Sequence, residues 1–230
     1  MRTIMVTGAS RGIGAELVSI LTARGDRVLA VVRDPSGLPE GAEPIVADLA
    51  DPASLAGALP DIERLDAVVH CAGISSPGPV GELGVGVWQR ELNVNLVAPA
   101  ELTRILLPAL RTARGQVVFV NSGAGLSAGP LWAAYGASKH GLKALADALR
   151  AEETGVVRVS TVYPGNTDTD MQRKLRAELK AEYDPARATS AATVATAIAQ
   201  VLDMPADAMV VDLRIVPPNP IPHPTRMPDA

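Results

Sequence analysis

Three side chains in this sequence have the types and spacing needed for proton transfer at an oxygen atom. Tyr135 and Lys139 are four residues apart in a helix-prone stretch, so on a helix their side chains would share one face. A free phenol has a pKa of about 10, and a nearby ammonium group favours the phenolate and lowers that pKa. Ser122 stands thirteen residues before Tyr135, just after a strand-like run. The set predicts a general acid or base that acts on a carbonyl or alcohol oxygen.

A tyrosine and a lysine at this spacing are also common on helix surfaces, where both are simply solvated. It is the joint pattern with Ser122 that favours catalysis over a solvated stripe.

A glycine-rich turn near the start of the chain could hold a phosphate group. Gly8, Gly12 and Gly14 follow one apolar run and open a helix-like stretch, with Ser10, Arg11 and Ile13 between them. Glycine permits a positive φ and a close approach of the backbone, and the free N–H groups of a helix start attract anions. The alternative is a strand-to-helix turn that needs glycine only for packing. With the Tyr/Lys/Ser set, the turn indicates a nicotinamide-dependent oxidoreductase.

The elements that would position these groups alternate along the chain. Seven short apolar runs are predicted strands: 4–7, 28–32, 44–47, 67–70, 117–120, 157–162 and 209–213. The main predicted helices are 13–24, 96–114, 133–153 and 190–203. Continuously apolar strands are typical of parallel sheets that are covered on both faces. The prediction is an α/β fold: one doubly wound parallel sheet of about seven strands, with helices on both faces.

Composition excludes several classes of protein. With 230 residues, 47% hydrophobic and 20% charged, the chain fits one globular domain over residues 1–230. A net charge of −4 and the lack of a basic run argue against nucleic acid as a partner. The single cysteine, Cys71, and the three histidines, His70, His140 and His223, show no metal-ligand spacing. We see no leader and no membrane-spanning run, so we expect a cytoplasmic protein without metal.

The glycine spacing, Gly-x-x-x-Gly-x-Gly, together with Ser122, Tyr135 and Lys139, resembles the classical short-chain dehydrogenase/reductase family over nearly the whole chain. The resemblance implies a Rossmann-type fold and hydride transfer between a nicotinamide and a carbonyl or secondary alcohol. It implies that Tyr135 is the general acid/base, that Ser122 binds the substrate oxygen, and that Lys139 also holds the nicotinamide ribose. Asn95 would support a proton-relay water; alternatively, Asn93 or Asn95 caps the following helix.

The family's NAD-preferring members carry an acidic residue at the position that is Val32 here. Arg33 follows directly, and Arg11 lies in the glycine turn; guanidinium groups suit a 2′-phosphate, so NADP(H) is favoured over NAD(H). Either arginine could instead be a solvated surface residue. Asp34 stands where a ribose-binding acid is often found, but we assign it to the loop that begins at Pro35.

Further cofactor contacts follow from the resemblance. The acidic pair Asp48-Leu49 would contact adenine, although Asp48 could instead begin a turn and cap the next helix. The remaining expected contacts are Ala72, Gly73, Pro164, Gly165, Thr167 and Thr169. Thr169 would bond the nicotinamide carboxamide; a plain Pro-Gly turn is the simpler interpretation of this loop and is compatible with that role.

The sequence departs from the family at Cys71, where an asparagine is usual. We expect Cys71 to be a buried apolar filler at a strand end rather than a reactive thiol. Residues 171–188 are the expected substrate-closing segment, with Met171 and Leu175 facing inward. Trp132 and Leu126 are expected to complete an apolar pocket.

The proline-rich tail, 217–230, is predicted to be a frayed end rather than a cover over the site or a contact with another subunit. By analogy with the family we expect a homodimer or homotetramer. Four alanines at positions 137, 144, 148 and 151 could serve that contact or pack on the sheet. The sequence favours an NADP(H)-dependent carbonyl reductase or alcohol dehydrogenase. An NAD-preferring dehydrogenase and a non-catalytic dinucleotide sensor or scaffold remain as alternatives.

Overall fold

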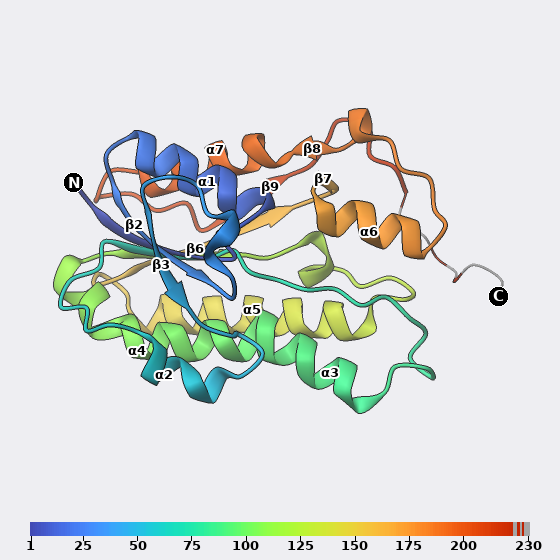
Figure 1. Ribbon diagram of the computed structural model, residues 1–230, viewed down its shortest axis with the longest axis horizontal. Helices are drawn as coiled ribbons and strands as arrows, with labels where there is room; N and C mark the ends of the chain where they lie inside the picture. Colours follow the sequence, from blue (N-terminus) through green and yellow to red (C-terminus); the bar gives the residue numbers. More distant parts are fainter. Residues whose placement is uncertain (223–224, 226, 228–230) are drawn as a thin grey trace.

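The computed structural model describes residues 1–222, 225 and 227, so His223 lies outside the described residues. The core is a parallel sheet of seven strands in the order β3-β2-β1-β4-β5-β6-β9, which confirms the predicted class (Figure 1). Its strands are β1 Thr3–Thr7, β2 Arg27–Val32, β3 Ala42–Val46, β4 Ala67–His70, β5 Gln116–Val120, β6 Arg158–Pro164 and β9 Asp212–Ile215. A separate two-stranded sheet pairs β7 Thr167–Asp168 with β8 Thr189–Ser190.

Helices cover both faces of the sheet. In Figure 1, α1 and α7 lie above it, and α3, α4 and α5 lie below. The α-helices are α1 Gly12–Ala23, α2 Leu55–Ala58, α3 Val85–Leu92, α4 Ala98–Ala113, α5 Ala133–Glu152, α6 Asp170–Glu178 and α7 Ala191–Leu202. A π-helix, Asn93–Val97, joins α3 to α4, and 3₁₀ turns lie at Pro35–Gly37, Pro52–Ser54, Gly123–Gly125 and Pro185–Arg187.

The sheet has an apolar core on each face, because side chains alternate between the two faces along every strand. In β5, Val117 and Phe119 join the apolar cluster under α4 and α5, whereas Val118 and Val120 join the cluster under α1 and α7. Successive side chains of a strand point to opposite faces, so a strand covered on both sides must be apolar throughout. This requirement is why continuous apolar runs located the strands.

Two elements differ from the sequence prediction. The last strand begins at Asp212 rather than at residue 209. Arg158 Nη1 donates to the carbonyl oxygens of Met204 and Ala208, 2.8 and 3.2 Å away, and so holds the loop that leads into this strand. Pairing with β6 starts only at Asp212, opposite Thr161. Helix α3 was not predicted, because Gly84 and Gly86 at its start have the composition of a turn.

The described part of the proline-rich tail packs against the protein. Ile221 is 6% exposed, and its carbonyl oxygen accepts a 2.8 Å hydrogen bond from Asn166 Nδ2. Arg176 of α6 is buried and donates through Nη1 to the carbonyl oxygen of Pro222 at 2.9 Å. Thr225 lies along the main cavity. The prediction of a frayed end is therefore wrong for residues 217–222, because two buried side chains need these carbonyl groups as partners.

The exposure of α5 answers whether its four alanines pack on the sheet, which the sequence left open. The alanines at 137, 144, 148 and 151 are all exposed, so they do not pack on the sheet. Among the described residues, no helix is both long and apolar enough to cross a membrane.

The order of the strands reverses between β1 and β4: β1 pairs with β2 on one side and with β4 on the other, in both cases parallel. Parallel sheets of this kind bind ligands in the crevice at the carboxyl ends of the strands, where the order reverses. The glycine turn fills this point. Gly8 has φ +67°, and a Cβ there would lie 2.7 Å from Ala72 Cα. A Cβ on Gly14 would collide with the Gly8 carbonyl group.

We predict that Gly14→Ala lowers the free energy of unfolding by about 1–3 kcal/mol, the typical cost of overpacking, because the Gly8 carbonyl cannot move without shifting β1. Gly57→Ala is the matched control, since a Cβ on Gly57 meets nothing within 4 Å. Urea unfolding of both variants measures the difference, and equal stabilities would contradict the close packing of this turn.

Candidate active site

A cavity of about 750 Å³ opens at the carboxyl ends of the central strands. Nearly all the residues singled out from the sequence line it: Gly8, Ser10, Arg11, Gly12, Ile13, Gly14, Arg33, Asp48, Leu49, Ala72, Gly73, Ser122, Tyr135, Lys139, Pro164, Gly165, Thr167 and Thr169. The glycine turn and the Tyr/Lys/Ser set thus share one cavity. Asn95, the remaining candidate, is fully buried behind its wall.

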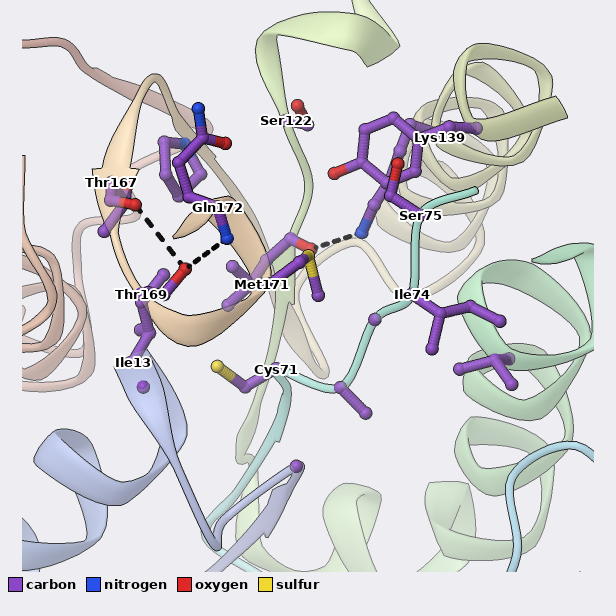
Figure 2. A pocket seen from close by; sticks show the side chains of 18 of the residues that line it. Ile13, Cys71, Ile74, Ser75, Ser122, Lys139, Thr167, Thr169, Met171 and Gln172 are labelled. Carbon is purple, nitrogen blue, oxygen red and sulfur yellow. Dashed lines mark hydrogen bonds between the residues drawn. The ribbon is translucent and has the colours of Figure 1, made fainter. Parts of the chain in front are cut away.

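Lys139 is placed by β5 and by the first turns of α5. Its side chain is buried, and Nζ donates to the Val120 carbonyl oxygen at 3.0 Å, the bond drawn in Figure 2. Nζ lies 5.8 Å from the centre of the Tyr135 ring. Burial lowers the pKa of Lys139 to about 8, although the nearby Cys71 and Glu91 raise it in part. The ammonium group is therefore held in a poorly solvated place beside the phenol.

Tyr135 is half-buried, and its ring meets Trp132 edge-on with the ring centres 6.0 Å apart. Burial raises the pKa of the Tyr135 phenol, interaction with the Ser122 hydroxyl lowers it, and the Glu91 carboxylate raises it further. The net direction is upward, which is opposite to the expectation from a neighbouring ammonium group. The reason is that desolvation of the phenolate outweighs the single hydroxyl that supports it.

Ser122 opens the short 3₁₀ turn that follows β5. Its Oγ accepts a hydrogen bond from the Ala124 N–H at 3.2 Å, which orients the hydroxyl at the turn. The buried residue just before it, Asn121, was not among the candidates predicted from the sequence. Asn121 Oδ1 accepts from the Ser122 N–H at 2.8 Å, and Nδ2 donates to the Lys139 carbonyl oxygen at 3.1 Å. An amide directly after the apolar run 117–120 was the signal that could have revealed this link.

Asn95 caps no helix, because the π-helix that contains it runs straight into α4. Its amide binds both backbone groups of Ile74 at 2.9 Å and donates to Ser138 Oγ at 3.0 Å. Asn93 also does not cap: its Nδ2 donates to the carbonyl oxygen of Ala50 at 2.9 Å. Asn95 therefore ties the loop after β4 to the helix that carries Tyr135 and Lys139.

Cys71 is half-buried and lines the cavity, so the expectation of a buried filler is only partly right. The chain leaves β4 at His70, which places Cys71 on the cavity floor. Burial raises the pKa of its thiol to about 12, although Lys139 lowers it in part, so the thiol stays protonated. Thr7 Oγ1 accepts from the N–H groups of Cys71 and Ala72, both at 3.1 Å, and so ties this part of the chain to β1.

The other end of the cavity carries positive charge. Arg11 and Arg33 are exposed there and form no ion pair with any residue that the structure describes. Arg90 of α3 also lines this cavity and was missed, because it stands outside any recognised motif. Asp34 accepts from the Ser36 N–H at 2.9 Å and so starts the loop, as expected. Asp48 accepts from the Ala50 N–H at 2.9 Å, which is a local turn bond compatible with a cofactor contact.

Thr169 lies between the glycine turn and α6. A Cβ on Gly12 would be 3.4 Å from the Thr169 methyl group. The hydroxyl caps α6 by accepting from the Gln172 N–H at 3.3 Å, as Figure 2 shows. The segment expected to close over substrate is thus anchored at the cofactor end of the cavity.

Helix α6 contributes Asp170, Met171, Gln172 and Leu175 to the cavity, and Leu175 packs with Trp132, the residue just before α5. Leu126 was expected in this apolar wall, but its side chain is 38% exposed and does not line the cavity. It follows the 3₁₀ turn at Gly123–Gly125, which directs it outward.

Comparison with known proteins agrees with this geometry. Residues 2–180 match the family model described as short chain dehydrogenase. The chain belongs to the short-chain dehydrogenase/reductase family. This is a family of NAD(P)-dependent oxidoreductases, and the glycine turn fits its cofactor, because Gly8, Gly12 and Gly14 line the cavity at the start of α1 and have no side chain to fill it.

Relatives in this family include bovine dehydrogenase/reductase SDR family member 7B, 33% identical over 73% of this chain; the alignment spans 58% of that protein. Yeast benzil reductase ((S)-benzoin forming) is 32% identical over 77% of this chain and 76% of its own length. A solved structure of a putative NAD(P)-dependent gluconate 5-dehydrogenase from Beutenbergia cavernae, with bound NADP, is 31% identical with a TM-score of 0.81. It covers 93% of this chain and 94% of its own.

The lowered pKa of Lys139 predicts a pH effect on stability. Between pH 8 and the ordinary lysine pKa of 10.5, the unfolded chain binds more protons than the folded one, so the folded state gains stability as the pH rises. Lys139→Met removes this term. The difference in unfolding free energy between wild type and Lys139→Met should be constant below pH 8 and shift in favour of wild type towards pH 10.5. Denaturant unfolding at several pH values measures it, and a flat difference would refute the low pKa.

Proposed function

We propose that this protein transfers a hydride between NADP(H) and an uncharged ketone, aldehyde or secondary alcohol. One observation carries the proposal: a glycine turn suited to a dinucleotide and the Ser122, Tyr135 and Lys139 set line the same cavity. The two motifs lie more than a hundred residues apart in sequence. They can act in one reaction if a cofactor bound at the glycine turn extends to the Ser122, Tyr135 and Lys139 set.

In reduction, bound NADPH supplies the hydride. Tyr135 gives its phenolic proton to the carbonyl oxygen, and the Ser122 hydroxyl donates a hydrogen bond to the same oxygen. Lys139 holds the nicotinamide ribose through the protons of Nζ that Val120 does not use. The Asn95 side-chain amide is hydrogen-bonded to Ile74 and Ser138, so we assign to it the role of fixing helix α5. A proton-relay water would therefore have to bind the backbone of Asn95 rather than its side chain.

The raised pKa of Tyr135 suits donation of a proton more than its removal. In the oxidative direction the phenolate needs support, and the cation of the oxidised nicotinamide beside the buried Lys139 would supply it. Hence we expect reduction to be favoured at neutral pH.

Two features support NADP(H) over NAD(H). Arg11 and Arg33 both line the cavity, and no carboxylate stands at position 32 to accept from a ribose hydroxyl. Asp34 is already engaged by the Ser36 N–H. A 2′-phosphate next to Arg33 would gain charge-assisted hydrogen bonds that NAD cannot make.

The substrate end of the cavity favours apolar molecules. Trp132 and Leu175 belong to one apolar cluster with Tyr135, and Met171 lines the cavity with them, whereas the polar residues that α6 adds to the lining are Asp170 and Gln172. The name of the yeast relative gives benzil, an aromatic ketone, as the substrate of that enzyme. We infer an apolar or aromatic carbonyl substrate here, with 171–188 as the segment that covers it.

We further propose that the exposed alanine face of α5 pairs with a second copy of the chain. Small side chains at 137, 144, 148 and 151 allow two helices to approach closely. The assembly would be a homodimer or homotetramer.

We predict that Tyr135→Phe removes nearly all NADPH-dependent turnover, by about 100-fold or more, because the proton donor is lost. Its dissociation constant for NADPH should stay within about twofold. Tyr163→Phe is the control, since this buried tyrosine lies on β6 away from the cavity. Full activity in Tyr135→Phe would exclude the proposed chemistry; tight NADPH binding with no turnover by the wild type would favour a sensor.

Arg33→Asp should invert the cofactor preference. The new carboxylate would repel a 2′-phosphate and accept from a ribose 2′-hydroxyl, so we expect the ratio of kcat/KM for NADPH to that for NADH to fall by about 100-fold. NADPH and NADH differ only in the 2′-phosphate, so a general loss of activity in the variant would lower both values and leave their ratio unchanged. An unchanged ratio would remove Arg33 from cofactor selection.

A further inference from the structure

The loop that follows β4 is held at two points by one helix face. Asn95 Oδ1 accepts from the Ile74 N–H, and Asn95 Nδ2 donates to the Ile74 carbonyl oxygen, both at 2.9 Å. Two residues later, the Ser76 N–H donates to Glu91 Oε1. Glu91 and Asn95 are four residues apart, so their side chains emerge from one side of the α3–π-helix segment. The loop is thus fixed on both sides of residue 75.

Glu91 is unusual in this place because it is 0% exposed. A buried carboxyl group is costly unless hydrogen bonds compensate it, and Glu91 gains a backbone N–H. Burial raises the pKa of Glu91, while Ser76 and Lys139 lower it. Neither the fold nor the catalytic set explains an acid here, since a leucine would fill the same helix position at lower cost. The geometry instead gives Glu91 a role in holding the loop after β4, through its hydrogen bond with the Ser76 N–H.

Ser75 is the residue between the two fixed positions. It is half-buried and lines the cavity, and Figure 2 shows it above Ile74 on the side of Lys139. Its hydroxyl oxygen is buried and has no hydrogen-bond partner among the described residues. An unsatisfied hydroxyl is unfavourable in a folded protein and needs explanation. Rotation about χ1 lets a serine hydroxyl reach a ligand in the cavity that its own residue lines.

The distance along the chain keeps Ser75 close to the reacting centre. A Cβ on Gly73 would lie 3.7 Å from Lys139 Nζ. Ser75 is two positions after Gly73, so their Cα atoms are at most about 7.6 Å apart. Ser75, Ser122 and Tyr135 line the same cavity, so we take the substrate carbon next to the reacting carbonyl to be within reach of the Ser75 hydroxyl.

We propose that Ser75 hydrogen-bonds a second, uncharged oxygen on the carbon next to the reacting carbonyl, so that the substrate class is vicinal diketones and α-hydroxy ketones. Glu91 and Asn95 act as positioning residues that hold Ser75 for this contact. A serine hydroxyl supplies one neutral donor, which suits an uncharged oxygen, and the cation beside it, Lys139, is assigned to Val120 and the nicotinamide ribose. The inference rests on the proposed function and adds a substrate class to it.

The experiment compares two ketones with the same carbon skeleton, 1-phenyl-1,2-propanedione and propiophenone, each with NADPH. We expect Ser75→Ala to lower kcat/KM for the dione by about tenfold, mainly through KM, and to change that for propiophenone by less than about twofold. Ser160→Ala is the matched control, because its hydroxyl is likewise buried without a described partner but lies on β6 away from the cavity. It should leave both values unchanged.

Glu91 is tested by a conservative and a disruptive variant. Glu91→Gln keeps an acceptor for the Ser76 N–H and should retain the wild-type ratio of dione to propiophenone activity. Glu91→Leu removes the acceptor, and the ratio should fall as in Ser75→Ala. A purely structural loss would lower both activities together and leave the ratio unchanged.

Equal effects of Ser75→Ala on both ketones, or no effect on either, would overturn the role of Ser75 while the reductase function stands. A ratio that falls in Glu91→Gln as much as in Glu91→Leu would overturn the positioning role of Glu91. A wild-type enzyme that reduces neither ketone nor any other member of a broad carbonyl panel would overturn the proposed function, and the inference with it.

Discussion

The buried ammonium group of Lys139 sets the geometry around it. A cation removed from water is costly unless polar groups surround it, and here the Val120 carbonyl oxygen at the end of β5 accepts from Nζ. The backbone of Lys139 is tied to the same strand through Asn121, and the neighbouring Ser138 is tied to Asn95. Strand β5, helix α5 and the π-helix therefore meet around one charged side chain, which leaves little freedom in the position of Tyr135.

The electrostatic effects of this arrangement oppose each other. Burial lowers the pKa of Lys139 and raises that of Tyr135, so the protein favours the neutral form of both groups. A positive charge in the cavity would stabilise the phenolate, whereas the carboxylate of Glu91 disfavours it. Such a site has a protonated phenol at neutral pH and depends on its ligands for further tuning.

Helix α6, which begins the segment proposed to cover the substrate, is held from two sides. Thr169 caps α6 beside the glycine turn, and Arg176 in the same helix binds carbonyl oxygens of the tail. Asp168 adds to this attachment through Arg173, 3.0 Å away, and through a hydrogen bond from Tyr183. The proline residues of the tail suit this role, because Arg176 and Asn166 need only backbone carbonyl groups, which proline retains.

Local pattern determined much of this protein. The apolar runs gave six of the seven sheet strands to within about two residues, because a strand buried on both faces must be apolar throughout. The spacing of Tyr135, Lys139 and Ser122 and the glycine turn indicated the family, since these are short-range constraints on side-chain placement.

Other features were decided only by contacts between distant segments. Three contacts of this kind join residues that are 15 to 45 positions apart. They are the hydrogen bonds from Ser76 to Glu91, from Asn121 to Lys139 and from Arg176 to Ile221. The direction of the Tyr135 pKa shift also emerged only in three dimensions. Sequence spacing reveals which charge is near, but the cost of desolvation depends on how completely the folded chain excludes water from the group.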